Sequence, residues 1–320
     1  MSADDVRPHD PGGSALTGEA WLNGRILPYS EAAVPVWDLG LVAGAAVTEM
    51  ARTYRHKPFR LAEHIRRLLD SCAELGFVVP YSEIELRQAA ETIVAGNRRL
   101  IPDQSDLGIV AFVTAGANAT YLGAKAAPRP TVCVHTFELP LSLWRDAAAS
   151  GLRLRVPARM QIPDSVLPIH LKIRNRLHWW LADREAERAE PGSRALLVNS
   201  DGHITETSSS CFYAVIDNEI VTPVTDVLNS MTRRIVRELA ASEGIAFEER
   251  QLSLQDVHAA TEAFTSSTPA GLLPVRTLNG NTLGSHCPGP VCSRLLAAWT
   301  RLTGVDTREQ IIGRTPPTRN

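Results

Sequence analysis

The sequence predicts an α+β protein of two domains. Its 320 residues exceed a single domain of about 100–200 residues, and the 44% that are hydrophobic are enough for two buried cores. Helical and strand-like periodicities both occur, and they are interrupted at Glu138-Leu-Pro-Leu-Ser142 before a new alternating run starts at Leu152. We therefore expect a flexible tail over 1–18, a small domain over 19–137, a linker over 138–148, a large domain over 149–305 and a loose tail over 306–320.

The N-terminal half contains clear local signals. The pair Asn23-Gly24 lies between apolar residues and predicts a β-hairpin. Residues 59–76 carry an apolar stripe at helical spacing and end in Gly76, a residue suited to a helix C-terminus. A second helix over about 82–98 and an apolar strand over 107–114 follow.

The stretch around Lys172 is the most informative part of the C-terminal half. Prolines precede it, and Ile173, Leu177, Trp180 and Leu181 follow at helical spacing, which predicts a lysine at the entry to a helix. A partly desolvated lysine has a lowered pKa and provides a neutral amine that can act as a nucleophile. From this window alone, a solvated surface lysine is the commoner alternative.

The downstream sequence provides a framework for that lysine. Residues 195–215 predict a strand, an Asp201-Gly202 turn, a second strand, a hydroxyl-rich loop and a third strand. Residues 229–241 predict a helix whose first turn carries hydroxyl caps. The start of such a helix presents free N–H groups to an anion, although an ordinary capped helix is the alternative.

Several ordered motifs resemble one enzyme family. Lys172 with Asn175, then Glu206-Thr-Ser-Ser-Ser, then Thr222-Pro223, then Met231-Thr-Arg233 resemble the fold-type IV pyridoxal-phosphate enzymes, from about Trp21 to Trp299. These are the branched-chain and D-amino-acid aminotransferases and aminodeoxychorismate lyase. The resemblance implies a small N-terminal α/β sandwich, a larger C-terminal pseudo-barrel, pyridoxal 5'-phosphate as cofactor and a homodimer.

The resemblance also implies roles for individual residues. Lys172 would hold the cofactor as an imine and then act as a base, and Glu206 would keep the pyridine nitrogen protonated. Arg67 matches the family's phosphate-binding arginine in H-x-x-R-L, with a register error of one open because Arg66 is adjacent. The other implied cofactor contacts are Ser208, Ser209, Ile220, Met231, Thr232 and Thr268, and the implied substrate residues are Thr48, Arg52, Ala115, Pro269 and Ala270. Ser208, Ser209 and Ile220 could equally be ordinary loop and core residues.

Departures from the family pattern bear on the substrate. Thr114-Ala-Gly116 stands where D-amino-acid transaminases carry Thr-Arg-Gly, and no arginine lies between Ser105 and Pro128, which argues against a D-amino-acid enzyme. Arg52 is either a carboxylate contact or a member of an ion pair. Small residues near Ala43 and the lack of an aromatic residue near Thr48 suggest a differently shaped pocket.

The predicted function is transamination from an apolar, branched-chain-like L-amino acid to a 2-oxo acid. Asn175-Arg176-Leu177 has the local form found in aminodeoxychorismate lyase, so elimination with pyruvate release is the alternative. A cofactor-binding protein without turnover is a third hypothesis.

Composition restricts the partners. The net charge of −2 is spread along the chain, which gives no basis for binding nucleic acid or an anionic membrane. No apolar run has the length of a membrane span and the N-terminus lacks a signal-peptide pattern, so we expect a cytoplasmic protein. The five scattered cysteines and dispersed histidines indicate reduced thiols and no metal site.

Overall fold

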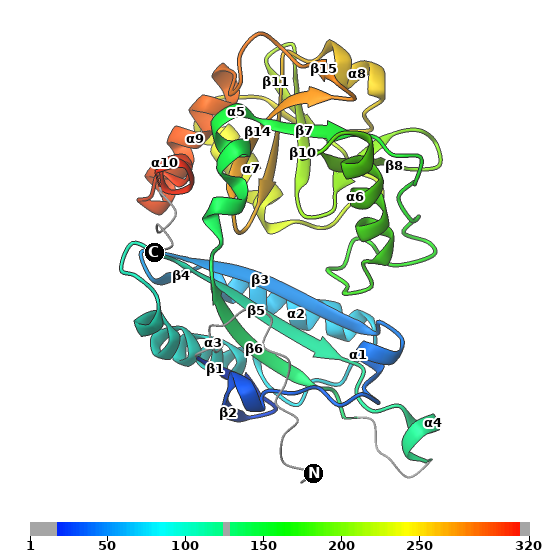
Figure 1. Cartoon of the computed structure of the whole chain (residues 1–320), viewed down its shortest axis with the longest axis vertical. Helices are drawn as coiled ribbons and strands as arrows, with labels where there is room; N and C mark the ends of the chain where they lie inside the picture. The colour runs from blue at the N-terminus through cyan, green and yellow to red at the C-terminus, as the bar shows by residue number, and fades with distance from the viewer. Residues whose placement is uncertain (1–17, 124–128, 314–320) are drawn as a thin grey trace, which may run out of the picture. The chain divides into compact units, whose positions relative to one another are not determined.

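The computed structural model describes residues 18–123 and 129–313. The chain forms two compact units, Met1–Leu139 and Pro140–Asn320, each of which is considered by itself (Figure 1). The predicted linker over 138–148 spans this division, but much of it is helical, in η3 (Leu141–Trp144) and α5 (Arg145–Ser150). The predicted N-terminal tail lies outside the described residues apart from Gly18.

The described part of unit 1 contains a six-stranded antiparallel sheet in the order β2-β1-β6-β5-β3-β4. The predicted hairpin is confirmed, since Asn23 and Gly24 adopt positive φ values of 49° and 87° between β1 and β2. The strands are β1 (Glu19–Leu22), β2 (Arg25–Pro28), β3 (Ala46–Tyr54), β4 (Lys57–Phe59), β5 (Leu107–Thr114) and β6 (Val132–Glu138).

Helices α2 (Leu61–Glu74) and α3 (Glu83–Asn97) pack against this sheet and against each other. The predicted stripe on α2 is confirmed by the burial of Leu61, Ile65, Leu68 and Cys72. Ser82 caps α3 in a reciprocal capping box with Glu85. Short segments complete the described part: η1 (Tyr29–Glu31), α1 (Leu39–Val42), η2 (Arg98–Leu100) and α4 (Ala119–Leu122).

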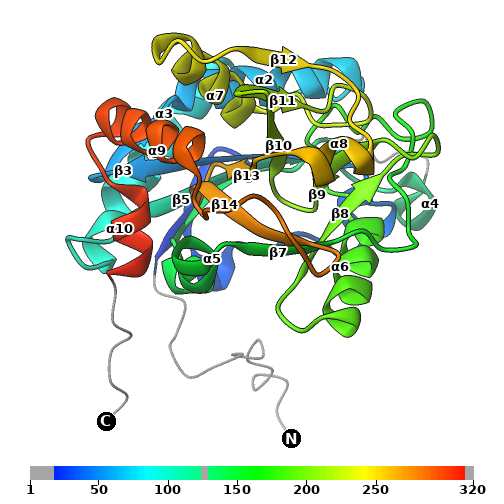
Figure 2. The same cartoon turned by 90° about the horizontal axis from the view of Figure 1, so that it is seen from above.

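Unit 2 is built on a nine-stranded mixed sheet in the order β12-β11-β10-β13-β14-β7-β8-β9, with β15 paired to β14. The Ile204 N–H on β9 donates to Leu252 O, just beyond β12, over 2.7 Å, so the two edges meet and the sheet curls into a half-barrel (Figure 2). The strands are β7 (Leu152–Arg155), β8 (Arg194–Val198), β9 (Ile204–Thr207), β10 (Cys211–Ile216), β11 (Glu219–Thr222), β12 (Phe247–Glu249), β13 (Glu262–Ser267), β14 (Gly271–Leu278) and β15 (Asn281–Thr282).

Helices pack against the curled sheet. They are α6 (Leu177–Ala189) on β8, α7 (Met231–Ser242) and α9 (Pro290–Thr303) on β13, and α8 (Leu254–Ala259) on β10, while α5 lies on β7 and β14. The predicted helix over 229–241 is confirmed, with Ser230 as its N-cap. No helix within 18–123 or 129–313 combines the length and apolarity needed to cross a bilayer.

The helix expected after Lys172 is present as α6, but it does not bury its largest apolar residues, and the prediction of a loose C-terminal tail is wrong in part. On α6 the buried residues are Trp179, Ala182 and Ala186, which pack on β8, whereas Leu177 and Trp180 are 63% and 58% exposed. The small alanines allow the helix to approach the sheet closely, so they define its inner face. The predicted loose tail over 306–320 instead starts as α10 (Thr307–Ile312), because Asp306 caps it and Ile311 is buried. Residues 314–320 lie outside the described residues.

Candidate active site

Lys172 lies in the loop that leads into α6, and it is half-buried between the buried side chains of Leu171 and Ile173. The loop is attached to the segment before α7, where the Asn229 N–H donates to His170 O over 3.1 Å. The lysine segment therefore has a defined position next to the start of α7.

Glu206 lies on β9 close to this lysine. It is 8% exposed, and the Leu228 N–H donates to its Oε1 over 3.2 Å. Burial raises the pKa of this carboxyl from 4.5 to about 7, although Arg176, the Leu228 N–H and Lys172 each lower it in part. Lys172 is therefore near enough to Glu206 to affect its charge.

Arg176 joins the lysine segment to the loop after Glu206, a role that sequence reasoning missed. Its Nη2 donates to Ser208 O, and its guanidinium carbon lies 5.7 Å from the centre of the Trp179 ring. Burial lowers the pKa of Arg176, and the nearby Glu206 acts in the opposite direction. The motif Asn175-Arg176-Leu177 was the available signal, but sequence spacing does not reveal a contact with residue 208.

The start of α7 carries a group of buried hydroxyls. Ser230 Oγ accepts the Arg233 N–H over 3.4 Å and lies 3.0 Å from Thr232 Oγ1. Ser266 Oγ, at the end of β13, donates to Thr232 Oγ1 over 2.9 Å. This bond connects the helix start to the turn between β13 and β14, which contains Thr268.

These residues supply the donor set that pyridoxal phosphate requires. Lys172 offers an amine for covalent attachment, Glu206 offers a carboxyl for a pyridine nitrogen, and the start of α7 offers N–H groups and the hydroxyl of Thr232 for a phosphate. We therefore consider that the residues fit this cofactor.

In unit 1, Arg67 belongs to a buried cluster with Glu49 and His64. Its Nε and Nη2 donate to the two Glu49 carboxylate oxygens over 2.6 and 2.8 Å, and His64 Nδ1 lies 2.7 Å from Glu49 Oε2. Burial would raise the pKa of Glu49, but Arg67 and His64 outweigh it and lower this pKa to about 2. The side chain of Arg66 is 63% exposed and pairs with Glu83 on the surface. Of these two arginines, only Arg67 therefore has a side chain fixed by the fold.

The remaining predicted residues differ in accessibility. The Arg52 side chain is 1% exposed, and its guanidinium lies 3.5 Å from Asp106 and 4.1 Å from the Tyr54 ring centre, which favours its ion-pair alternative over a substrate contact. Ile220 is fully buried on β11, which favours its alternative as a core residue. Thr48, Ala115, Ser208, Thr268 and Pro269 are half-buried, Ser209 is exposed, and Met231, Thr232 and Ala270 are buried.

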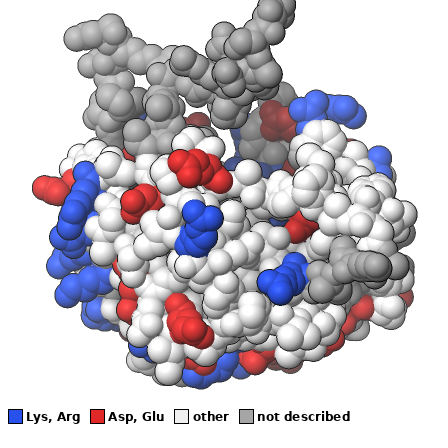
Figure 3. All heavy atoms as spheres, turned by 90° about the horizontal axis from the view of Figure 1, so that it is seen from below, with Lys and Arg blue, Asp and Glu red and all other residues white. Residues whose placement is uncertain are grey.

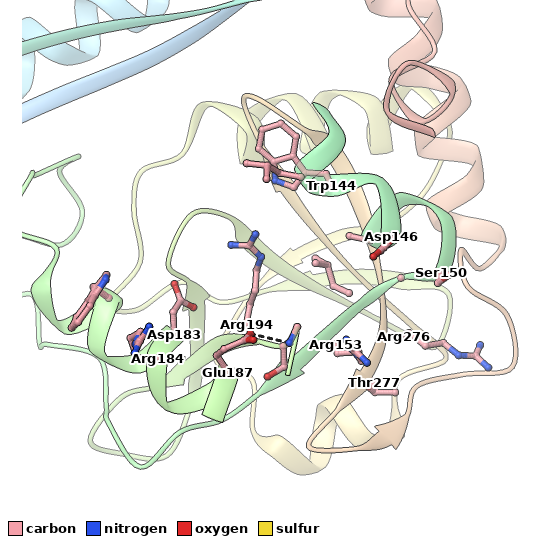
Figure 4. Close-up of a pocket in the computed structure, with 17 residues that line it drawn as sticks. Trp144, Asp146, Ser150, Arg153, Asp183, Arg184, Glu187, Arg194, Arg276 and Thr277 are labelled. Carbon is pink, nitrogen blue, oxygen red and sulfur yellow. Dashed lines mark hydrogen bonds between the residues drawn. The ribbon is translucent and has the colours of Figure 1, made fainter. Parts of the chain in front are cut away.

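A surface hollow of about 770 Å³ in unit 2 lies apart from these residues, between α5 and α6 over β7 (Figure 4). None of the predicted site residues lines it. Its charged side chains are of both signs: Arg153, Arg184, Arg194 and Arg276 with Asp146, Asp183 and Glu187. Basic and acidic side chains are likewise interspersed on the face seen in Figure 3, outside the grey atoms. The hollow therefore favours neither an anionic nor a cationic ligand.

Comparison with known proteins identifies the family of this chain. The model of the amino-transferase class IV family matches residues 46–278. D-alanine aminotransferase of Bacillus licheniformis is 33% identical over 87% of this chain and 94% of its own. The crystal structure of Escherichia coli branched-chain amino acid aminotransferase superposes with a TM-score of 0.82 at 26% identity, over 94% of this chain and 97% of the other.

A further solved structure contains a derivative of the cofactor. It is a T.th. branched-chain amino acid aminotransferase complexed with N-(5'-phosphopyridoxyl)-L-glutamate, and it superposes with a TM-score of 0.78 at 27% identity, over 94% of this chain and 96% of the other. The family match covers both units and includes Arg67, Lys172, Glu206 and Thr232. The chain belongs to the class IV aminotransferase family and is an enzyme that transfers amino groups.

Proposed function

We propose that this enzyme uses pyridoxal 5'-phosphate to transfer an amino group from an apolar L-amino acid to a 2-oxo acid. The observation that carries this proposal is the buried carboxyl of Glu206 near Lys172. The loop that contains Lys172 is bonded to the segment before α7. An amine for attachment and a carboxyl for the ring nitrogen are the two groups that such chemistry needs most, and here the amine is half-buried and the carboxyl is buried.

Each residue has a distinct task. The bound cofactor supplies an electron sink for the bond being broken at the substrate Cα. Lys172 Nζ would hold the cofactor and, when its amine is free, would take the Cα proton and return it. Glu206 would pair with the ring nitrogen, whose positive charge would favour the carboxylate form. Thr232 and Thr268 would hold the phosphate. The family resemblance assigns the same task to Arg67, and the bonds from Arg67 to Glu49 orient its guanidinium.

The proposed substrate class depends on the lack of an arginine side chain at residues 114–116. Thr114-Ala-Gly116 provides no guanidinium for a substrate carboxylate, and the small, half-buried Ala115 is the reason to expect a substrate with an apolar side chain. A hydrophobic pocket discriminates by only about 1–3 kcal/mol per methylene, so we expect a broad preference among apolar donors. The D-alanine aminotransferase relative makes D-alanine the strongest competing donor.

The test is a comparison of donors. Purified, cofactor-loaded protein is mixed with L-leucine, D-alanine or aminodeoxychorismate at equal concentration, and the initial change in cofactor absorbance is recorded. We expect L-leucine to react fastest and its amino group to be passed to 2-oxoglutarate or pyruvate. We expect the Lys172→Ala variant to react with none of the three donors. A faster reaction with D-alanine would refute the argument from Ala115. Pyruvate release from aminodeoxychorismate without an acceptor would establish the lyase alternative.

A further inference from the structure

A chain of buried hydroxyls leads from the middle of the sheet to the start of α7. Tyr213 Oη on β10 lies 2.8 Å from Ser266 Oγ on β13, and Ser266 Oγ donates to Thr232 Oγ1 over 2.9 Å. The exposed fractions of Tyr213, Ser266 and Thr232 are 0%, 1% and 4%. Water therefore does not compete for these bonds, and each hydroxyl depends on its neighbour for a partner.

The direction of the hydrogen bonds follows from counting hydrogens. Burial raises the pKa of Tyr213 well above its usual value, so its phenol keeps its hydrogen. Because Ser266 gives its single hydrogen to Thr232, it accepts the hydrogen of Tyr213. Thr232 Oγ1 accepts from Ser266, so its own hydrogen can be donated either to Ser230 Oγ, 3.0 Å away, or to a ligand at the start of α7.

The surroundings hold this arrangement in place. The Tyr213 ring stacks on Phe264, with ring centres 4.7 Å apart and planes at 11°. Cys211 interacts with both Tyr213 and Ser230, and burial together with Glu206 raises its pKa to about 11, so it remains a thiol. A thiol is a weaker hydrogen-bond partner than a hydroxyl, so it competes poorly with Ser266 for the Tyr213 hydrogen.

We propose that Tyr213 and Ser266 are positioning residues that orient the Thr232 hydroxyl as a hydrogen-bond donor to the cofactor phosphate. This inference rests on the proposed function, because it requires the phosphate to bind at the start of α7. A phosphate only accepts hydrogen bonds, so Thr232 strengthens binding when its hydrogen points toward the ligand and not toward a neighbour. Tyr213 and Ser266 act through Thr232 and do not touch the ligand.

The experiment compares pyridoxal phosphate with pyridoxal, which lacks the phosphate. Dissociation constants are measured by cofactor absorbance and tryptophan fluorescence for the wild type, Tyr213→Phe and Ser266→Ala. Each variant is expected to weaken pyridoxal phosphate binding about fivefold, the effect of one neutral hydrogen bond, and to leave pyridoxal binding unchanged. Thr205→Val is the matched control, because it removes another buried hydroxyl, which donates to Leu197 O over 3.0 Å in the same sheet.

A second set of variants tests the route of the effect. In a Thr232→Val background, Tyr213→Phe is expected to cause no further loss of pyridoxal phosphate affinity, since the orienting hydroxyl has no target. An equal loss for both ligands, a further loss in the Thr232→Val background, or a similar loss in Thr205→Val would overturn the proposal. If the wild type binds pyridoxal phosphate and both Tyr213→Phe and Ser266→Ala bind it with the same affinity, only this inference is refuted. A wild type that binds no pyridoxal phosphate would refute the proposed function as well.

Discussion

Replacing Glu206 with glutamine should change how the stability of the cofactor-free enzyme depends on pH. The carboxyl has a pKa of about 7 in the folded protein, against 4.5 as its ordinary value. Between these two values the folded state holds a proton that the unfolded state has released, so the free energy of unfolding falls as pH rises. The contribution is fully present below pH 4.5 and is lost as pH rises through about 7.

The size of the effect follows from the difference between the two pKa values. A shift of one pKa unit corresponds to about 1.4 kcal/mol, so the whole effect is about 3 kcal/mol, most of which falls between pH 5 and pH 8. Urea unfolding of the wild type and of Glu206→Gln at both pH values measures it. The free energy of unfolding of the wild type, relative to that of the variant, is expected to fall by about 2–3 kcal/mol on going from pH 5 to pH 8.

Glu49→Gln provides the control for this experiment. The pKa of Glu49 is lowered to about 2, so its stabilising contribution is present above pH 4.5 and is lost as pH falls through about 2. The titration of this carboxyl therefore adds almost no difference between pH 5 and pH 8 in that variant. Saturation with pyridoxal phosphate should flatten the wild-type curve, since a cationic ring nitrogen favours the charged form of Glu206. A wild-type curve parallel to that of Glu206→Gln would refute the raised pKa.

Three further predictions concern attachment, anchoring and assembly. Borohydride reduction of the loaded enzyme followed by peptide mass mapping should label Lys172, and a label on Lys57 instead would refute the assignment. Arg67→Lys should weaken cofactor binding at least about tenfold because it loses bidentate geometry, whereas Arg66→Lys should leave the dissociation constant nearly unchanged; a reversed order would place the phosphate contact on Arg66. Sedimentation of the active enzyme should give a homodimer, and a fully active monomer would contradict this expectation.

The elements that the sequence predicted correctly are those with local causes. The turn at Asn23-Gly24, the helix α3 that follows Ser82 and the hydroxyl cap of α7 depend on residues within a few positions of one another. The same holds for α2, whose apolar stripe is long and regular. Sequence patterns describe such features well because the interactions that stabilise them are close along the chain.

The inner face of α6 shows where pattern reading fails. Leu177 and Trp180 are the larger apolar residues, but the helix buries Trp179, Ala182 and Ala186. A residue faces the sheet when its size suits the distance between helix and sheet, and that distance is fixed by β8. Hydrophobicity ranks Trp180 above Ala182, so it assigns the wrong side of the helix to the core.

The candidate site depends on contacts between residues far apart in the sequence. Arg176 reaches the carbonyl of Ser208, and Tyr213 reaches Thr232 through Ser266, yet no local pattern links these positions. The family motifs predicted Glu206 and Thr232 as site residues, but not Arg176, Tyr213 and Ser266, which contact the segments around them. The curl of the sheet brings β9, β10 and β13 close to the start of α7. Glu206 is buried in this region, and Thr232 accepts the hydrogen of Ser266 there. The pKa of Glu206 and the hydrogen bonds of Thr232 therefore depend on the residues around them. Variants of Arg176, Tyr213 and Ser266 would change these surroundings while Glu206 and Thr232 stay in place.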